Sequence, residues 1–229
     1  MNDLRGTQRR EWPTRLLFLW LVGLGTVLGM VAVFMDLVED VWFREGFGWD
    51  APLIMGLHHL SRPWLDTVMR LVTQTGEVGA IALVIVLTGW FVYHHRPLDA
   101  ATVVVSFIGA VALNSLLKIL LARPRPFLFP PLVVESGFSF PSGHVTASVA
   151  AYGTLAVFLW RQGHRGWAVV SAAWVPVVAV SRVYLGVHYP SDTLGSLIFA
   201  SLWLLVVFSV RDAYARRQQP ASETAGFPS

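Results

Sequence analysis

The sequence predicts an all-α, polytopic membrane protein built as a bundle of six transmembrane helices. Of its 229 residues, 55% are hydrophobic and only 14% are charged, and the mean hydropathy is +0.57. Soluble domains usually carry about 25% charged residues, so much of this surface is expected to face lipid. We expect one membrane-embedded domain, residues 1–217, and a disordered tail rich in Pro, Ser and Ala, residues 218–229.

Six apolar stretches are candidate spans, because a membrane-spanning helix needs about 20 apolar residues. The first, 16–35, follows Arg9, Arg10 and Arg15 and so resembles a signal peptide. It is long, however, and no clear small-residue cleavage site follows it, so we expect it to remain as a span. The other five are expected at 78–93, 100–121, 143–160, 167–182 and 190–210.

The connection between the first two spans is more polar than its flanks. Within it, residues 51–73 carry apolar side chains at mixed helical spacing. This pattern predicts amphipathic helices that lie on the membrane surface. Pro63 is expected to break or restart the helix, because proline lacks the backbone N–H that a helix interior needs.

The arginines predict the orientation, since cytoplasmic loops of membrane proteins are enriched in Lys and Arg. Six spans place both termini and the second and fourth connections on one face. Ten arginines fall there: Arg5, Arg9, Arg10, Arg15, Arg96, Arg161, Arg165, Arg211, Arg216 and Arg217. We therefore expect both termini in the cytoplasm. The same placement explains the basic character of the chain and argues against nucleic-acid binding.

Three segments combine charged residues with the ends of predicted spans. They are 118–126, 141–144 and 181–192. The six-span topology places all three on the extracytoplasmic face. That face would then hold several cations, a helix N-terminus, two histidines and a carboxylate.

The first segment holds the protein's only lysine, Lys118, at the end of an apolar stretch. A snorkelling side chain and a functional cation both fit that position. Arg123 and Arg125 follow in a proline-stiffened loop, where they are interfacial anchors or part of an anion site. The neighbouring histidines favour the anion site.

The second and third segments add the groups that can do chemistry. Ser142 is a candidate N-cap and Gly143 permits close approach to the backbone, so free amides there can bind phosphate. Helix capping does not explain His144 at a membrane boundary. Asp192 follows His188 by four residues, and either one helical turn or a capped turn beginning at Pro190 brings its carboxylate to the imidazole.

These segments resemble the signature of the type-2 phosphatidic acid phosphatase (PAP2) superfamily, K-x6-RP, PSGH and SR-x5-H-x3-D, at every fixed position between Lys118 and Asp192. The resemblance implies a nucleophile that forms a phosphohistidine (His188), a carboxylate that orients its ring (Asp192) and a general acid (His144). It implies that phosphate oxygens are held by Lys118, Arg125, Arg182 and the amides near Ser142 and Gly143. It also implies that the reaction needs no metal or cofactor.

The resulting hypothesis is a membrane phosphatase that acts on a lipid phosphate or pyrophosphate. Undecaprenyl pyrophosphate is favoured, with phosphatidylglycerol phosphate and phosphatidic acid close, because the motifs recognise phosphate and do not read the lipid tail. A lipid phosphotransferase using the same site is the alternative enzyme. An anion or lipid transporter fits less well, because no inverted repeat is visible and transport does not need a His–Asp pair. The oligomeric state stays open.

A few other residues invite interpretation. The pairs His58–His59 and His94–His95 suggest metal ligands, but adjacent residues do not share a helix face, so we interpret them as interfacial side chains. Glu135 and Phe138 precede the second motif and are expected either to line the entrance for the headgroup or to have only a loop role.

Overall fold

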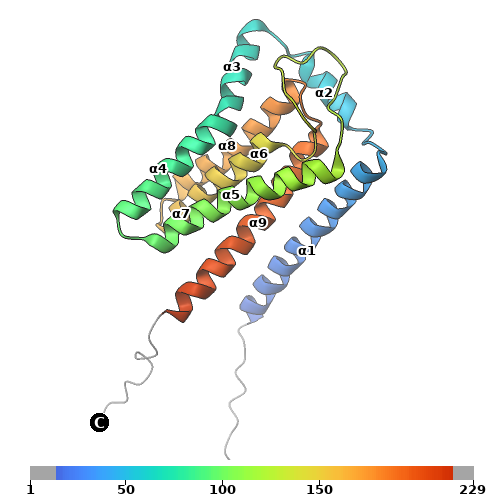
Figure 1. Cartoon of the computed structure of the whole chain (residues 1–229). Coiled ribbons are helices and arrows are strands. Elements are labelled where there is room, and N and C mark those ends of the chain that lie inside the picture. Colours follow the sequence, from blue (N-terminus) through green and yellow to red (C-terminus); the bar gives the residue numbers. More distant parts are fainter. Residues whose placement is uncertain (1–13, 219–229) are drawn as a thin grey trace, which may run out of the picture.

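The computed structural model describes residues 14–218, and this part of the chain is all-α (Figure 1). Two π-helical turns, η1 (Thr75–Gly79) and η2 (Val149–Gly153), interrupt the helices. The α-helices are α1 (Thr14–Phe43), α2 (Asp50–His58), α3 (Pro63–Gln74), α4 (Ala80–Tyr93), α5 (Pro97–Leu121), α6 (Gly143–Ser148), α7 (Thr154–Arg161), α8 (Arg165–Tyr184) and α9 (Pro190–Arg217). Apart from Gln218, the predicted tail lies outside the described residues.

Within residues 14–218, six continuous helices are long and apolar enough to cross a membrane, which confirms the predicted fold class. They are Leu17–Phe43, Pro63–Tyr93, Pro97–Leu121, Gly143–Arg161, Arg165–Tyr184 and Pro190–Arg217. Three of their ends differ clearly from the prediction. The first helix ends eight residues later, the second begins fifteen residues earlier and the sixth ends seven residues later. The protein is therefore a multi-pass membrane protein.

The second spanning helix begins much earlier than expected. As predicted, a helix starts at Pro63, but it runs through η1 into α4, so residues 63–73 belong to the second spanning helix and do not form a separate helix. Its 31 residues extend about 46 Å at 1.5 Å per residue, whereas the hydrocarbon core is about 30 Å thick. This helix is therefore longer than the apolar layer is thick. The short helix α2 is a separate element that packs against α8 and α9.

The bundle packs around a core of aromatic and aliphatic side chains. Phe91, Val103, Phe158, Leu204 and Phe208 belong to its largest buried cluster, to which α4, α5, η2, α7, α8 and α9 all contribute. Helix α1 lies at the edge of the bundle and packs mainly against α9 (Figure 1). Its outer half reaches the loop before α6, where the rings of Phe34 and Phe140 stack with centroids 6.4 Å apart.

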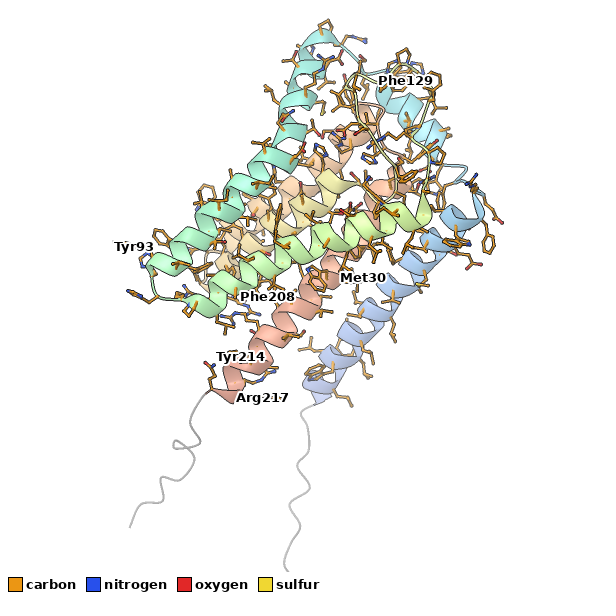
Figure 2. The ribbon with its side chains drawn as sticks, in the orientation of Figure 1. Met30, Tyr93, Phe129, Phe208, Tyr214 and Arg217 are labelled. Atoms are coloured by element: carbon orange, nitrogen blue, oxygen red, sulfur yellow. The ribbon has the colours of Figure 1, made fainter. Side chains whose placement is uncertain are left out.

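The two ends of the bundle hold different groups of polar residues. The end that holds residues 14 and 218 also holds Tyr214 and Arg217, whereas Phe129 lies at the opposite end (Figure 2). The end near the termini is joined by an ion-pair network of Arg96, Asp99, Arg161, Arg211 and Asp212. The three motif segments meet at the opposite end, which the sequence predicted.

The paired histidines lie against aromatic rings. The ring of His58 stacks on Phe129 with centroids 3.6 Å apart, and the ring of His94 lies 4.2 Å from that of Trp90. These contacts agree with interfacial packing of His58 and His94.

Candidate active site

His188 lies in the tight connection between α8 and α9. Gly186 has a φ of +75° there, a conformation that glycine adopts without steric cost, and a Cβ at this position would meet the ring of Phe129. The side chain of His188 is buried. Its Nδ1 atom lies 3.5 Å from Asp192 Oδ2 and 3.5 Å from Ser139 Oγ. Its Nε2 atom lies 3.4 Å from Nη1 of Arg125.

Asp192 is fixed by a capped turn at the start of α9. The backbone N–H of Tyr189 donates to its Oδ2 atom at 2.8 Å, and the hydroxyl of Ser139 donates to the same oxygen at 2.5 Å. The helix begins at Pro190, so the capped turn, and not a full helical turn from His188, brings the two side chains together.

Arg123 lies behind this pair and not in an anion site for a ligand. Its guanidinium donates to Asp192 Oδ1 at 2.5 Å, to Asp50 Oδ2 at 2.9 Å and to Ser191 Oγ at 2.7 Å. Asp50 also accepts the backbone N–H of Ser191 at 2.9 Å. The interpretation of Arg123 as a ligand-binding cation is therefore corrected, because protein carboxylates already neutralise it. The network ties α2 to the start of α9.

His144 occupies the first turn of α6 and faces two carboxylates. Its Nε2 atom lies 3.1 Å from Oε2 of Glu77 and 4.0 Å from Oε1 of Glu135. Glu135 also accepts a 2.5 Å hydrogen bond from Nη2 of Arg182, whose Nη1 donates to Thr73 at 2.7 Å. The general-acid candidate therefore stands among groups of both signs.

Ser142 holds the N-cap position of α6 with an extended backbone, but its side chain does not cap the helix. Its hydroxyl is buried without a hydrogen-bond partner among the described residues, and its backbone N–H donates to the carbonyl of Asp192 at 3.4 Å. The predicted position is correct and the predicted capping hydrogen bond is absent. The amides that follow still open the helix N-terminus, where four N–H groups have no intrahelical acceptor.

A cavity of about 370 Å³ joins these groups. Its polar lining includes Lys118, Arg125, Glu135, His144 and His188. Phe138 and Gly143 also line it, and Lys118 donates to the carbonyl of Phe138 at 2.5 Å. Asp192 and Arg182 are buried and do not line the cavity. Asp192 contacts the lining residue His188, and Arg182 contacts the lining residue Glu135. Glu135 and Phe138 thus line the cavity, and a role at the entrance for the headgroup stays a prediction.

The electrostatics of the cavity keep its nucleophile candidate neutral. Burial lowers the pKa of His188 to about 4, against the opposing effect of Asp192 and with help from Arg182 and Arg125. Burial alone would raise the pKa of Glu135, but the charge and hydrogen bond of Arg182 hold it below its usual value. At neutral pH His188 is thus uncharged, with a free ring nitrogen, while Glu135 is a carboxylate.

Comparison with known proteins places this arrangement in a family. Residues 99–216 match the PAP2 superfamily. The chain belongs to the PAP2 superfamily.

Similar proteins include several lipid phosphatases. Phosphatidylglycerophosphatase B of Bacillus subtilis is 36% identical over 159 residues, which cover 66% of this chain and 76% of that protein. Undecaprenyl-diphosphatase BcrC of the same organism is 29% identical over 163 residues, covering 69% and 81%. The crystal structure of a transmembrane PAP2-type phosphatidylglycerolphosphate phosphatase from B. subtilis superposes with a TM-score of 0.74 at 27% identity, covering 85% of this chain and 98% of that one.

Sequence reasoning missed several residues that contact the motif segments of this PAP2 site. Ser139, Asp50, Glu77 and Thr73 contact the motif residues directly. Ser139 stands two residues before the second motif, so its proximity was available from the sequence. The other three lie before residue 99, outside the stretch matched to the family, and only the fold brings them to the site.

Proposed function

We propose that this PAP2 protein hydrolyses the terminal phosphate of a membrane lipid through a phosphohistidine on His188. Nε2 of His188 attacks phosphorus, and the bond from phosphorus to the leaving oxygen breaks while His144 gives that oxygen a proton. His144 then takes a proton from water, the water oxygen attacks phosphorus, and the phosphorus–nitrogen bond breaks. Free phosphate and the starting enzyme result, so protons and bonds balance over the cycle.

The observation that carries this proposal is that the two ring nitrogens of His188 have different surroundings. Nδ1 faces the buried Asp192 and Ser139, which can hold a proton on that nitrogen. Nε2 faces Arg125 in the cavity. A neutral imidazole held in this tautomer presents its lone pair where a phosphate would sit.

The cations around the cavity supply the charge stabilisation that phosphoryl transfer needs. Lys118, Arg125 and Arg182 are the candidate ligands of the three non-reacting oxygens, together with the amides near Ser142 and Gly143. Arg182 donates a hydrogen bond to Glu135 in this structure, so a phosphate that binds Arg182 would displace this carboxylate. Because side chains provide the positive charge, the proposed reaction proceeds without a metal ion or cofactor.

The shape of the cavity supports a substrate anchored in the bilayer. Below the polar groups it is lined by Ile81 of α4 and by Phe107 and Val111 of α5, which are apolar side chains of two spanning helices. A lipid can leave its tail at this level while its headgroup reaches the cations. The relatives' names support both phosphatidylglycerol phosphate and undecaprenyl pyrophosphate as substrates to test.

We further propose that the site opens on the extracytoplasmic face. The site lies at the end of the bundle opposite residues 14 and 218 (Figure 1). Arg15, Arg96, Arg161, Arg165 and the C-terminal arginines belong to the other end. That distribution follows the positive-inside rule and supports cytoplasmic termini.

The test is phosphate release by the purified full chain in liposomes that contain single defined lipids, with and without a metal chelator. We expect release from a lipid phosphate, unchanged by the chelator and absent in His188→Ala. Loss of activity with the chelator would contradict metal independence. Transfer of the phosphate to an added alcohol, with little free phosphate, would favour a phosphotransferase, and uptake of phosphate without hydrolysis would favour a transporter.

A further inference from the structure

The π-helical turn η1 is held against the site by contacts from three other elements. The hydroxyl of Tyr152 donates to the carbonyl of Thr75 at 2.9 Å, and the indole N–H of Trp174 donates to the Thr75 hydroxyl at 2.9 Å. Gly76 permits the close approach, because a Cβ there would lie 2.6 Å from Val178 and 3.2 Å from the carbonyl of His144. π-turns inside α-helices often mark functional sites.

This turn places Glu77 beside the nitrogen that the proposed acid would use. Glu77 Oε2 lies 3.1 Å from His144 Nε2, and within the described part of the chain this is its one ion-pair partner. Glu135 differs, because Arg182 and Arg125 lie 2.5 Å and 3.9 Å from its carboxylate oxygens. Glu77 thus contributes the less compensated negative charge next to His144.

A leaving oxygen that takes its proton from His144 must approach Nε2 to hydrogen-bond distance. Whatever is attached to that oxygen then lies within a few ångströms of the Glu77 carboxylate. An alcohol there is neutral and can donate a hydrogen bond. A leaving phosphate is negatively charged and meets a like charge, which disfavours it.

We propose that Glu77 is a specificity-determining residue that selects phosphomonoesters, whose leaving group is an alcohol, over pyrophosphates, whose leaving group is a phosphate. This inference rests on the proposed function, in particular on His144 as the acid. Lys118 and Arg125 line the same cavity, but the ammonium of Lys118 already donates to the Phe138 carbonyl. The Glu77 side chain is 60% exposed, so solvent moderates the repulsion.

The experiment compares two substrates with the same tail, dodecyl phosphate and dodecyl diphosphate, on the purified full chain. The wild type is set beside Glu77→Gln, which removes the charge and keeps the shape, and Glu77→Asp, which keeps the charge. Glu39→Gln, an exposed carboxylate on α1 outside the cavity, is the matched control. The measured quantity is kcat/KM for each substrate.

We expect Glu77→Gln to lower the monoester-to-diphosphate ratio by about tenfold, the scale of a like-charge contact at a partly solvated site, and to raise kcat/KM for the diphosphate. Glu77→Asp and Glu39→Gln should keep a ratio close to that of the wild type. An unchanged ratio in Glu77→Gln, or a fall in diphosphate activity equal to the fall in monoester activity, would overturn the inference. A wild-type protein that releases phosphate from neither compound would instead contradict the proposed function.

Discussion

The two histidines of the cavity stand in opposite surroundings. His188 is backed by Asp192, Ser139 and Arg123, all buried, and the carboxylate of Asp192 has donors on both oxygens. His144 faces Glu77 and Glu135, whose side chains are 60% and 26% exposed. A nucleophile needs one tautomer and one direction, which a closed network supplies. A proton donor must meet leaving groups and water, which requires an open side.

The hydrogen-bond network behind His188 also explains how the buried ion pairs of Arg123 are stabilised. A buried ion pair costs desolvation of both partners, and that cost is offset only when further hydrogen bonds complete the geometry. Arg123 meets this condition because it bridges Asp50 and Asp192 and its guanidinium also lies over the Tyr189 ring at 4.2 Å. The connection between the first two spans, through Asp50, thereby helps to support the proposed nucleophile, His188.

The largest effect is expected when the proposed nucleophile, His188, is removed. His188→Ala should lower the rate of phosphate release by at least about 10⁴-fold, the scale seen when a covalent nucleophile is deleted. Phosphate release from the active lipid measures this, with circular dichroism as the control for folding. A folded variant that retains more than a hundredth of the activity would contradict the assignment.

The next largest effect concerns the buried cation. Arg123→Met leaves Asp50 and Asp192 without their shared partner and should lower the free energy of unfolding by about 3–5 kcal/mol. Arg161→Met breaks the half-exposed pair with Asp212 and should cost about 1 kcal/mol or less. Equilibrium unfolding in mixed micelles compares the two. Similar losses in both variants would show that the buried ion pairs of Arg123 stabilise the protein no more than the half-exposed pair of Arg161.

A pH effect should follow from the burial of His188. Its pKa in the folded protein is about 4, below the ordinary value of about 6.5, so between these values the unfolded chain binds a proton that the folded protein does not. The free energy of unfolding therefore does not depend on this histidine above about pH 6.5. It falls as the pH is lowered from there toward 4, by at most about 3 kcal/mol.

Melting temperatures at about pH 7 and about pH 5 test this effect. The wild type should lose more between the two conditions than His188→Gln, which has no titrating group at this position. An equal loss in both proteins would assign the acid sensitivity to other groups.

A smaller effect on stability is expected from a change in η1, on the His144 side of the cavity. Gly76→Ala introduces a Cβ that collides with Val178 and should destabilise the protein by about 1–3 kcal/mol while shifting η1 away from His144. Gly89→Ala on α4 is the control, since nothing lies within 4 Å of its added Cβ. Thermal melting and activity are measured together. Wild-type values for both in Gly76→Ala would show that the turn does not need this close approach.

The part of the site that the sequence could predict is the part encoded locally. Fixed spacings within the three motifs identified His188, His144, Asp192 and the cations, and hydrophobic stretches located all six spans. The start of the second span was missed because Thr75, Gly76 and Gly79 resemble a helix end. Packing against α6 and α8 outweighs that weak helix propensity.

The part that could not be predicted consists of contacts between distant residues. Arg123 was read as a possible ligand for an anion, yet its partner Asp50 comes from a connection 73 residues earlier. Glu77 likewise meets His144 only through the fold. Neither spacing nor periodicity encodes such pairs, because any polar residue at the outer end of a span is an equally good candidate.

The most direct test of the account is to trap the phosphorylated enzyme. A lipid carrying a radioactive terminal phosphate is mixed with the purified protein and the reaction is quenched within the first turnover. We expect a labelled protein whose label is stable in alkali and lost in acid, as for a phosphorus–nitrogen bond, and no label in His188→Ala. A label that survives acid, or that persists in His188→Ala, would contradict the central claim that His188 is the nucleophile.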